Sequence, residues 1–228
     1  MSFSLPTRLT LPVIFGVALA TGFSGAVVPG SLLAVVVTNS MQFGWVAGPI
    51  MMIGHGILEL VAVILLTTGL IKFARSNVVR GGIGVIGGLV LLYLGYLTVQ
   101  IPGETAAGSG QAATGWPHLI ALGGLMSMAN PYWWLWWATI GVAHVGWATQ
   151  IGKTGGVTYF TGHILSDVAW YSAVSAALAA GRTLFSPAVL RGIYVVCGAF
   201  LVALGVLFLV GGMRALRKRE TAREESVT

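Results

Sequence analysis

Residues 46–71 read VAGPIMMIGHGILELVAVILLTTGLI, a long apolar stretch whose only ionisable side chains are His55 and Glu59. Its length exceeds the roughly 20 residues that a membrane-spanning helix requires. The composition agrees, because 56% of the residues are hydrophobic and 8% are charged, whereas soluble domains have about 25% charged residues. The sequence therefore predicts an all-α integral membrane protein.

Six apolar runs are long enough to span a membrane. We predict six transmembrane helices at residues 11–37, 46–71, 81–99, 117–142, 155–180 and 192–213. Ten of the 12 Lys and Arg residues fall on one side of this arrangement, and only Arg182 and Arg191 fall on the other. Basic loops mark the cytoplasmic side, so both termini are predicted to be cytoplasmic. The net charge of +6 therefore indicates topology and not a nucleic-acid partner.

The chain divides into two similar halves. VVPGS at 27–31 corresponds to ANPYW at 129–133, GHGILE at 54–59 to GHILSD at 162–167, and RGGIGVIGG at 80–88 to RGIYVVCGA at 191–199. A three-span unit that is repeated must enter the membrane from the opposite side the second time, as in the inverted repeats of secondary transporters. We predict a first repeat at 1–100, a loop at 101–116, a second repeat at 117–213 and a basic cytoplasmic tail at 214–228 that contacts membrane lipid.

Two pairs of polar residues lie inside the predicted spans. His55 precedes Glu59, and His163 precedes Asp167, by four residues, so each pair lies on one helix face about 5–6 Å apart. Acidic residues at mid-membrane are costly, by about 2.5–3.5 kcal/mol, and mark candidate functional sites. The pairs could exchange protons, neutralise a cationic substrate or bind a divalent metal. A purely structural role, hydrogen bonds that tie the two helices together, is the alternative.

The paired motifs Pro29–Gly30 and Asn130–Pro131 interrupt the first and fourth spans. Proline bends or breaks a helix, and freed backbone groups at mid-membrane can bind a substrate. We favour a binding site over a simple kink. The aromatic run YWWLWW at 132–137 is either a cation-binding wall or an interfacial belt, and we favour the belt. His118 and His144, near span ends, are expected to be interfacial, and the glycines of 81–88 to allow close helix packing.

Three stretches resemble the LysE/RhtB family of amino-acid exporters: residues 27–56, the ANPYWWLWW motif at 129–137 and residues 181–212. The chain departs from that pattern at Ser31, where a second proline is usual, and at Tyr132, where lysine is usual. Histidine and carboxylate pairs within the spans are also not expected across the family. The resemblance implies a six-helix, multi-pass exporter of the cytoplasmic (inner) membrane, driven by an ion gradient and often dimeric, with amino acids as the usual substrates.

These observations predict a transporter and not an enzyme: a proton-coupled exporter, working by alternating access, of a small polar solute such as an amino acid. The predicted substrate or proton site comprises eight residues from the two halves: Pro29, Gly30, His55, Glu59, Asn130, Pro131, His163 and Asp167. The alternative is a divalent metal exporter that uses the two His and carboxylate pairs. A membrane enzyme lacks support, because no nucleophile motif is present. We predict no cofactor, and a homodimer is possible.

Overall fold

The computed structural model describes residues 9–68, 77–103, 115–181 and 185–224, and these residues form helices, turns and short connections with no strand. The α-helices, in order, are α1 (Leu11–Ala26), α2 (Ser31–Phe43), α3 (Ala47–Thr67), α4 (Asn77–Gln100), α6 (Trp116–Met128), α7 (Pro131–Trp136), α8 (Val142–Ala148), α9 (Lys153–Ala180) and α10 (Pro187–Glu224), and a π-helical turn, Trp137–Gly141, joins α7 to α8. The prediction of an all-α fold is confirmed. The inverted repeat and the cytoplasmic termini stay predictions.

The first and fourth predicted spans are each divided into two helices. α1 ends before Pro29, and α6 ends before Asn130 and Pro131. Two described stretches, Ser31–Thr67 and Pro187–Arg217, are long and apolar enough to cross a membrane by length and composition. The interruptions predicted at Pro29–Gly30 and Asn130–Pro131 are thus present, because proline cannot continue a helix, and the count of six spans stays a prediction.

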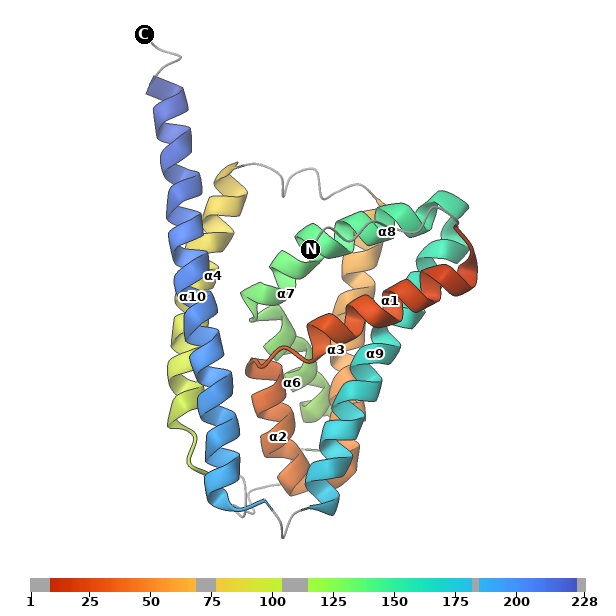
Figure 1. Cartoon of the computed structure of the whole chain (residues 1–228), viewed down its shortest axis with the longest axis vertical. Coiled ribbons are helices and arrows are strands. Elements are labelled where there is room, and N and C mark those ends of the chain that lie inside the picture. Colours follow the sequence, from red (N-terminus) through yellow and green to blue (C-terminus); the bar gives the residue numbers. More distant parts are fainter. Residues whose placement is uncertain (1–8, 69–76, 104–114, 182–184, 225–228) are drawn as a thin grey trace.

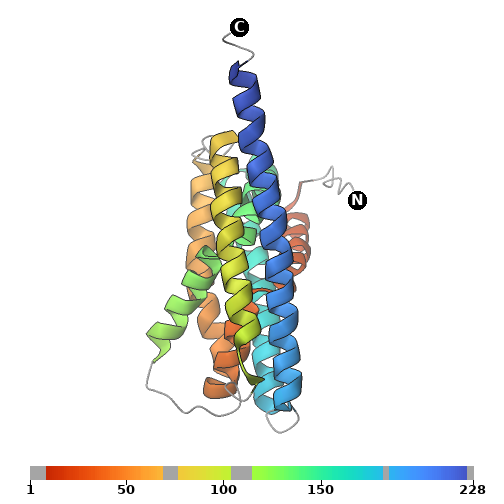
Figure 2. The same cartoon turned by 90° about the vertical axis from the view of Figure 1, so that its left-hand side faces the viewer.

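α4 and α10 run side by side along the length of the molecule (Figures 1 and 2). Glycines allow the two backbones to approach closely. A Cβ added at Gly95 would lie 2.8 Å from the carbonyl oxygen of Gly198, and a Cβ added at Gly88 would lie 2.8 Å from the carbonyl oxygen of Gly205. Such small residues let membrane helices approach closely. The prediction that the glycines of 81–88 serve close packing is confirmed for Gly81, Gly84, Gly87 and Gly88, whereas nothing lies within 4 Å of a Cβ added at Gly82.

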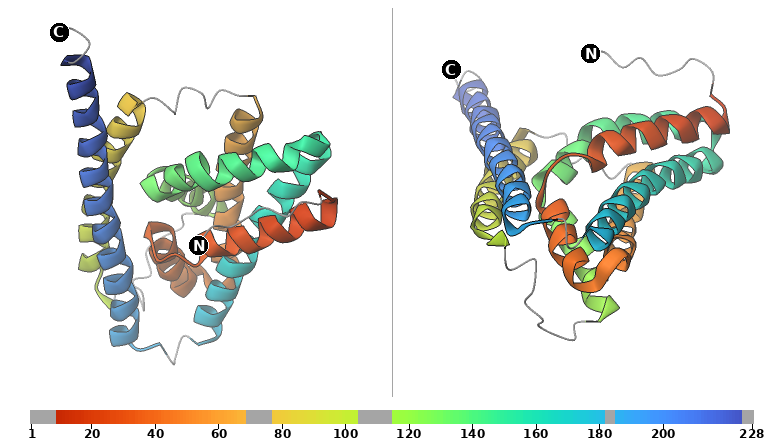
Figure 3. Two further views of the ribbon diagram at one scale, coloured as in Figure 1. Left: turned by 45° about the horizontal axis from the view of Figure 1, so that its top comes forward. Right: turned by 60° about the horizontal axis from the view of Figure 1, so that its bottom comes forward.

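The remaining helices form a second group in which α1 packs on α9 and α3 packs on α6. α1 and α8 lie obliquely to α4 and α10 (Figure 3). Glycines again mark the crossings: Gly22 of α1 faces His163 of α9, and Gly123 of α6 faces the backbone of Met51 in α3. These crossings bring α1, α3, α6 and α9 together around the residues described next.

Candidate functional site

The two helix interruptions lie next to each other. Between α1 and α2 the chain leaves the helical conformation, and Gly30 is extended, with φ −162°. Between α6 and α7, Asn130 is also extended, and its Oδ1 accepts a hydrogen bond of 3.0 Å from the Tyr132 amide, as an N-cap residue does. A Cβ added at Gly30 would lie 3.7 Å from Nδ2 of Asn130. The two corresponding motifs, Pro29–Gly30 and Asn130–Pro131, therefore lie next to each other in the structure.

Four buried side chains from α3 and α9 gather beside these interruptions. His163 Nε2 donates a hydrogen bond of 3.2 Å to Glu59 Oε1, and His55 Nε2 lies 3.1 Å from the same oxygen. Asp167 Oδ2 lies 3.9 Å from Nε2 of each imidazole. Each of the four residues is 5% exposed or less. The structure therefore joins the two predicted pairs into one cluster, with Glu59 between the two imidazoles.

Ser127 of α6 fixes the orientation of His55. Its hydroxyl donates a 2.7 Å hydrogen bond to the Gly123 carbonyl, and His55 Nδ1 lies 2.6 Å from the same hydroxyl oxygen. Since the serine proton is already used, the imidazole must donate from Nδ1. In neutral His55 the lone pair is then on Nε2, which faces Glu59. This nitrogen can accept a proton or bind a cation.

A cavity of about 70 Å³ opens onto the cluster. Its lining includes all four cluster residues, Gly30, Asn130 and Ser127. Pro29 and Pro131, which were also predicted to line the site, are not among its lining residues. The ring of Pro131 instead packs against α4, where a Cβ added at Gly87 would lie 2.8 Å from it. The structural contribution of these prolines is therefore to interrupt the helices.

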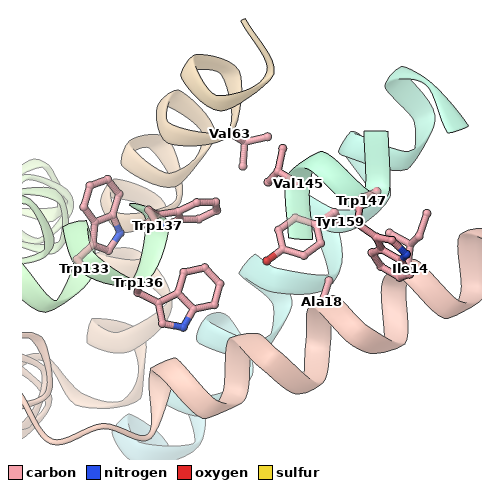
Figure 4. Packing of buried hydrophobic residues seen from close by; sticks show 10 residues of the cluster. Ile14, Ala18, Val63, Trp133, Trp136, Trp137, Val145, Trp147 and Tyr159 are labelled. Carbon is pink, nitrogen blue, oxygen red and sulfur yellow. The ribbon is translucent and has the colours of Figure 1, made fainter. Parts of the chain in front are cut away.

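Three tryptophans line the cavity, and Figure 4 shows how their side chains lie relative to one another. Trp133, Trp136 and Trp137 are 8%, 5% and 3% exposed, and the ring of Trp136 lies 4.6 Å from that of His163. The expectation of an interfacial belt is wrong for these three residues. Their spacing of three and four positions places them on one helix face, while Trp134 is 45% exposed. That spacing is a signal by which the sequence could have identified them.

His144 is also buried, contrary to the expected interfacial position. It is 8% exposed because α8 packs against α9, where its ring stacks on that of Tyr159 at 6.1 Å. Tyr159 in turn stacks on His163 at 6.0 Å. His118, the other histidine expected at an interface, is exposed near the start of α6. Tyr159 and Ser127 are site neighbours that the sequence analysis did not identify.

Residues 23–212 match the family model of the LysE type translocator, a span that includes both helix interruptions and the whole cluster. The chain belongs to the LysE type translocator family. The resemblance noted in the sequence is thereby confirmed, and the chain is a membrane protein of a transporter family. Comparisons with curated proteins and with solved structures gave no significant match.

The site of this LysE-type chain also has the donor set of a divalent metal site. His55, Glu59 and Asp167 each offer one ligand atom, and these atoms all lie within 4.8 Å of one another. Imidazole and carboxylate together suit zinc, nickel or manganese. The same groups can bind a proton or an ammonium group. The cluster is therefore suited to positively charged species.

Proposed function

We propose that this chain exports a small polar solute with a cationic group, such as an amino acid, across the cytoplasmic membrane in exchange for protons. The observation that carries the proposal is the cluster itself: Glu59 and Asp167 are buried beside two imidazoles, where the two interrupted helices meet. Isolated charges in such a place are unfavourable, so they are retained for a function. The membership of a translocator family supports transport as that function.

Competition for the same carboxylates would couple the solute to protons. When an ammonium group lies between Glu59 and Asp167, the imidazoles lose the favourable interaction that holds a proton on them. When the solute leaves, His55 Nε2 and the carboxylates can take up protons again. Solute and protons would therefore occupy the cluster alternately, which is what an antiporter requires.

The cavity size supports alternating access. At about 70 Å³ it is roughly half of the 150 Å³ cavity that holds benzene, so an amino acid with a large side chain does not fit without movement. We propose that the helices around it separate toward one side of the membrane and then toward the other. The interruptions at Gly30 and Asn130 provide the places where such helices bend.

The outer surface supports the membrane setting. Large apolar side chains are exposed on the outer faces of α3, α4 and α10: Ile57, Val61, Ile64, Ile86, Leu89, Val206 and Leu207. We propose that they contact lipid, that both termini are cytoplasmic and that the basic tail meets anionic headgroups. A homodimer within the inner membrane, with a small molecule and no nucleic acid as partner, completes this proposal.

Export of a divalent metal through the same cluster is the second candidate. It is favoured by one observation, the three ligand atoms within 4.8 Å of one another. The small cavity is also compatible with an ion. Under this alternative the metal is the cargo, and amino acids should not bind.

A thermal-shift screen of detergent-purified protein against amino acids and divalent cations tests both candidates. Ligands that bind only the folded state raise its stability, by about 2.7 kcal/mol at 100 times Kd. We expect stabilisation by an amino acid that is lost in Glu59→Gln/Asp167→Asn and retained in Glu220→Gln, a control in the tail. Stabilisation by a metal alone would favour the second candidate. Stabilisation by an amino acid that persists in the double variant would contradict both.

A further inference from the structure

The three tryptophans of the cavity wall carry hydrogen-bond donors without a partner. Among the residues that the structure describes, no acceptor contacts Nε1 of Trp133, Trp136 or Trp137, although each nitrogen is buried. Over 90% of buried polar groups in native proteins are paired, and an unpaired one costs about 1–3 kcal/mol. All three side chains line the cavity, which is where a ligand with acceptor groups would meet them.

The Nε1 nitrogen of Trp136 is buried against α1. A Cβ added at Gly25 of α1 would lie 3.5 Å from Nε1 of Trp136, and Gly25 lines the same cavity. The indole nitrogen is turned toward α1 (Figure 4). Because Gly25 has no side chain, α1 offers no side-chain acceptor to this donor at that position.

The chemistry of these donors selects a partner. An indole N–H only donates hydrogen bonds, so it binds an acceptor such as a carboxylate oxygen and does not favour a bare cation. The residues lining the same cavity include acceptors without a hydrogen-bond partner, Glu59 Oε2 and Asp167 Oδ2, of which the second lies 3.9 Å from Nε2 of each imidazole. A solute with both an ammonium and a carboxylate group satisfies both sets, whereas an amine or a metal ion satisfies only the acceptors.

We propose that the indole N–H groups of Trp133, Trp136 and Trp137 bind the carboxylate of the transported solute and so determine its specificity. The inference rests on the proposed export function and adds a second subsite to the cationic one at Glu59 and Asp167. It differs from a cation–π role, in which the faces of the rings would hold an ammonium group. Replacing tryptophan by phenylalanine keeps an aromatic face and removes the N–H, which separates the two roles.

The test compares matched ligand pairs on purified protein, with binding measured by thermal shift and by titration calorimetry. Each amino acid is paired with the amine that lacks its carboxylate: alanine with ethylamine, and lysine with 1,5-diaminopentane. Trp133→Phe, Trp136→Phe and Trp137→Phe are compared with wild type. Trp134→Phe is the control, because it removes an indole from the same run whose N–H already donates to the Met128 carbonyl at 2.8 Å.

Wild type should bind the carboxylate-bearing member of at least one pair more tightly. Each cavity variant should lower that preference by about tenfold or more, because it loses one hydrogen bond to a charged group, and should leave the amine affinity unchanged. The control should keep the wild-type preference. A role in packing alone would weaken both members of a pair equally and would overturn the proposal.

Two further results would also overturn it. One is that no amino acid binds to or stabilises the wild-type protein more than its paired amine does. This result does not depend on whether any variant folds. The other is a wild-type preference that persists in all three cavity variants, which would leave solvent as the partner of the donors. The proposed function fails separately, when amino-acid binding persists in Glu59→Gln/Asp167→Asn.

Discussion

Gly22 of α1 is the position at which one added methyl group should disturb the site most directly. A Cβ there would overlap the buried Ser166 hydroxyl and lie 2.9 Å from His163 Nδ1 and 3.0 Å from the His163 carbonyl oxygen. The serine could rotate away, but it would lose its 2.6 Å hydrogen bond to that carbonyl, and the backbone contact would remain. Gly22→Ala must therefore displace α1 from α9.

Gly16 provides the matched control on the same helix, since nothing lies within 4 Å of a Cβ added there. The gain in helix propensity is common to both variants and cancels. Overpacking costs about 1–3 kcal/mol, and loss of the serine hydrogen bond costs about 1 kcal/mol. Gly22→Ala should therefore be less stable than Gly16→Ala by about 2–4 kcal/mol.

Reversible unfolding of both variants in mixed detergent micelles measures this difference as a free energy of unfolding. Gly22→Ala should also weaken ligand binding, because His163 moves with α9 away from Glu59. Gly16→Ala should bind as wild type does. Free energies of unfolding within 0.5 kcal/mol of each other would refute the close crossing of α1 and α9, and with it the geometry of the cluster.

Two further comparisons test a hydrogen bond at the site and the packing of α4 on α10. Ser127→Ala should reduce the free energy of unfolding by about 1–3 kcal/mol, because His55 Nδ1 loses its 2.6 Å partner; unchanged stability would contradict that hydrogen bond. Gly205→Val should lower the melting temperature because its Cβ would lie 3.0 Å from the Gly88 carbonyl oxygen, whereas Gly211→Val has open space; equal melting temperatures would argue against the glycine contacts between α4 and α10.

The polar centre of the fold could be predicted from the sequence because its residues repeat. His55 and Glu59 have counterparts in His163 and Asp167 at the same four-residue spacing, and ionisable groups in apolar helices must find one another or a cavity. The interruptions at Pro29–Gly30 and at Asn130–Pro131 were visible for an equally local reason, since proline cannot continue a helix.

The contacts that complete the site were not visible, because they join residues far apart in the chain. Ser127 lies 72 residues from the imidazole that it orients, and nothing local marks it as a partner. For the tryptophans the signal is present in the sequence, since positions 133, 136 and 137 share one helix face, and the belt interpretation does not account for that spacing. His144 was misplaced for a similar reason, because the burial of α8 against α9 depends on tertiary packing.

Release of a labelled amino acid from preloaded proteoliposomes tests the central claim most directly. The amino acid is the one that stabilises the purified protein, and an imposed proton gradient drives release. Wild-type protein should accelerate release in proportion to the gradient, and Glu59→Gln/Asp167→Asn, reconstituted at the same level, should release no faster than empty liposomes. Gradient-driven release by the double variant at the wild-type rate would contradict the assignment of the buried cluster as the site that binds and couples the solute.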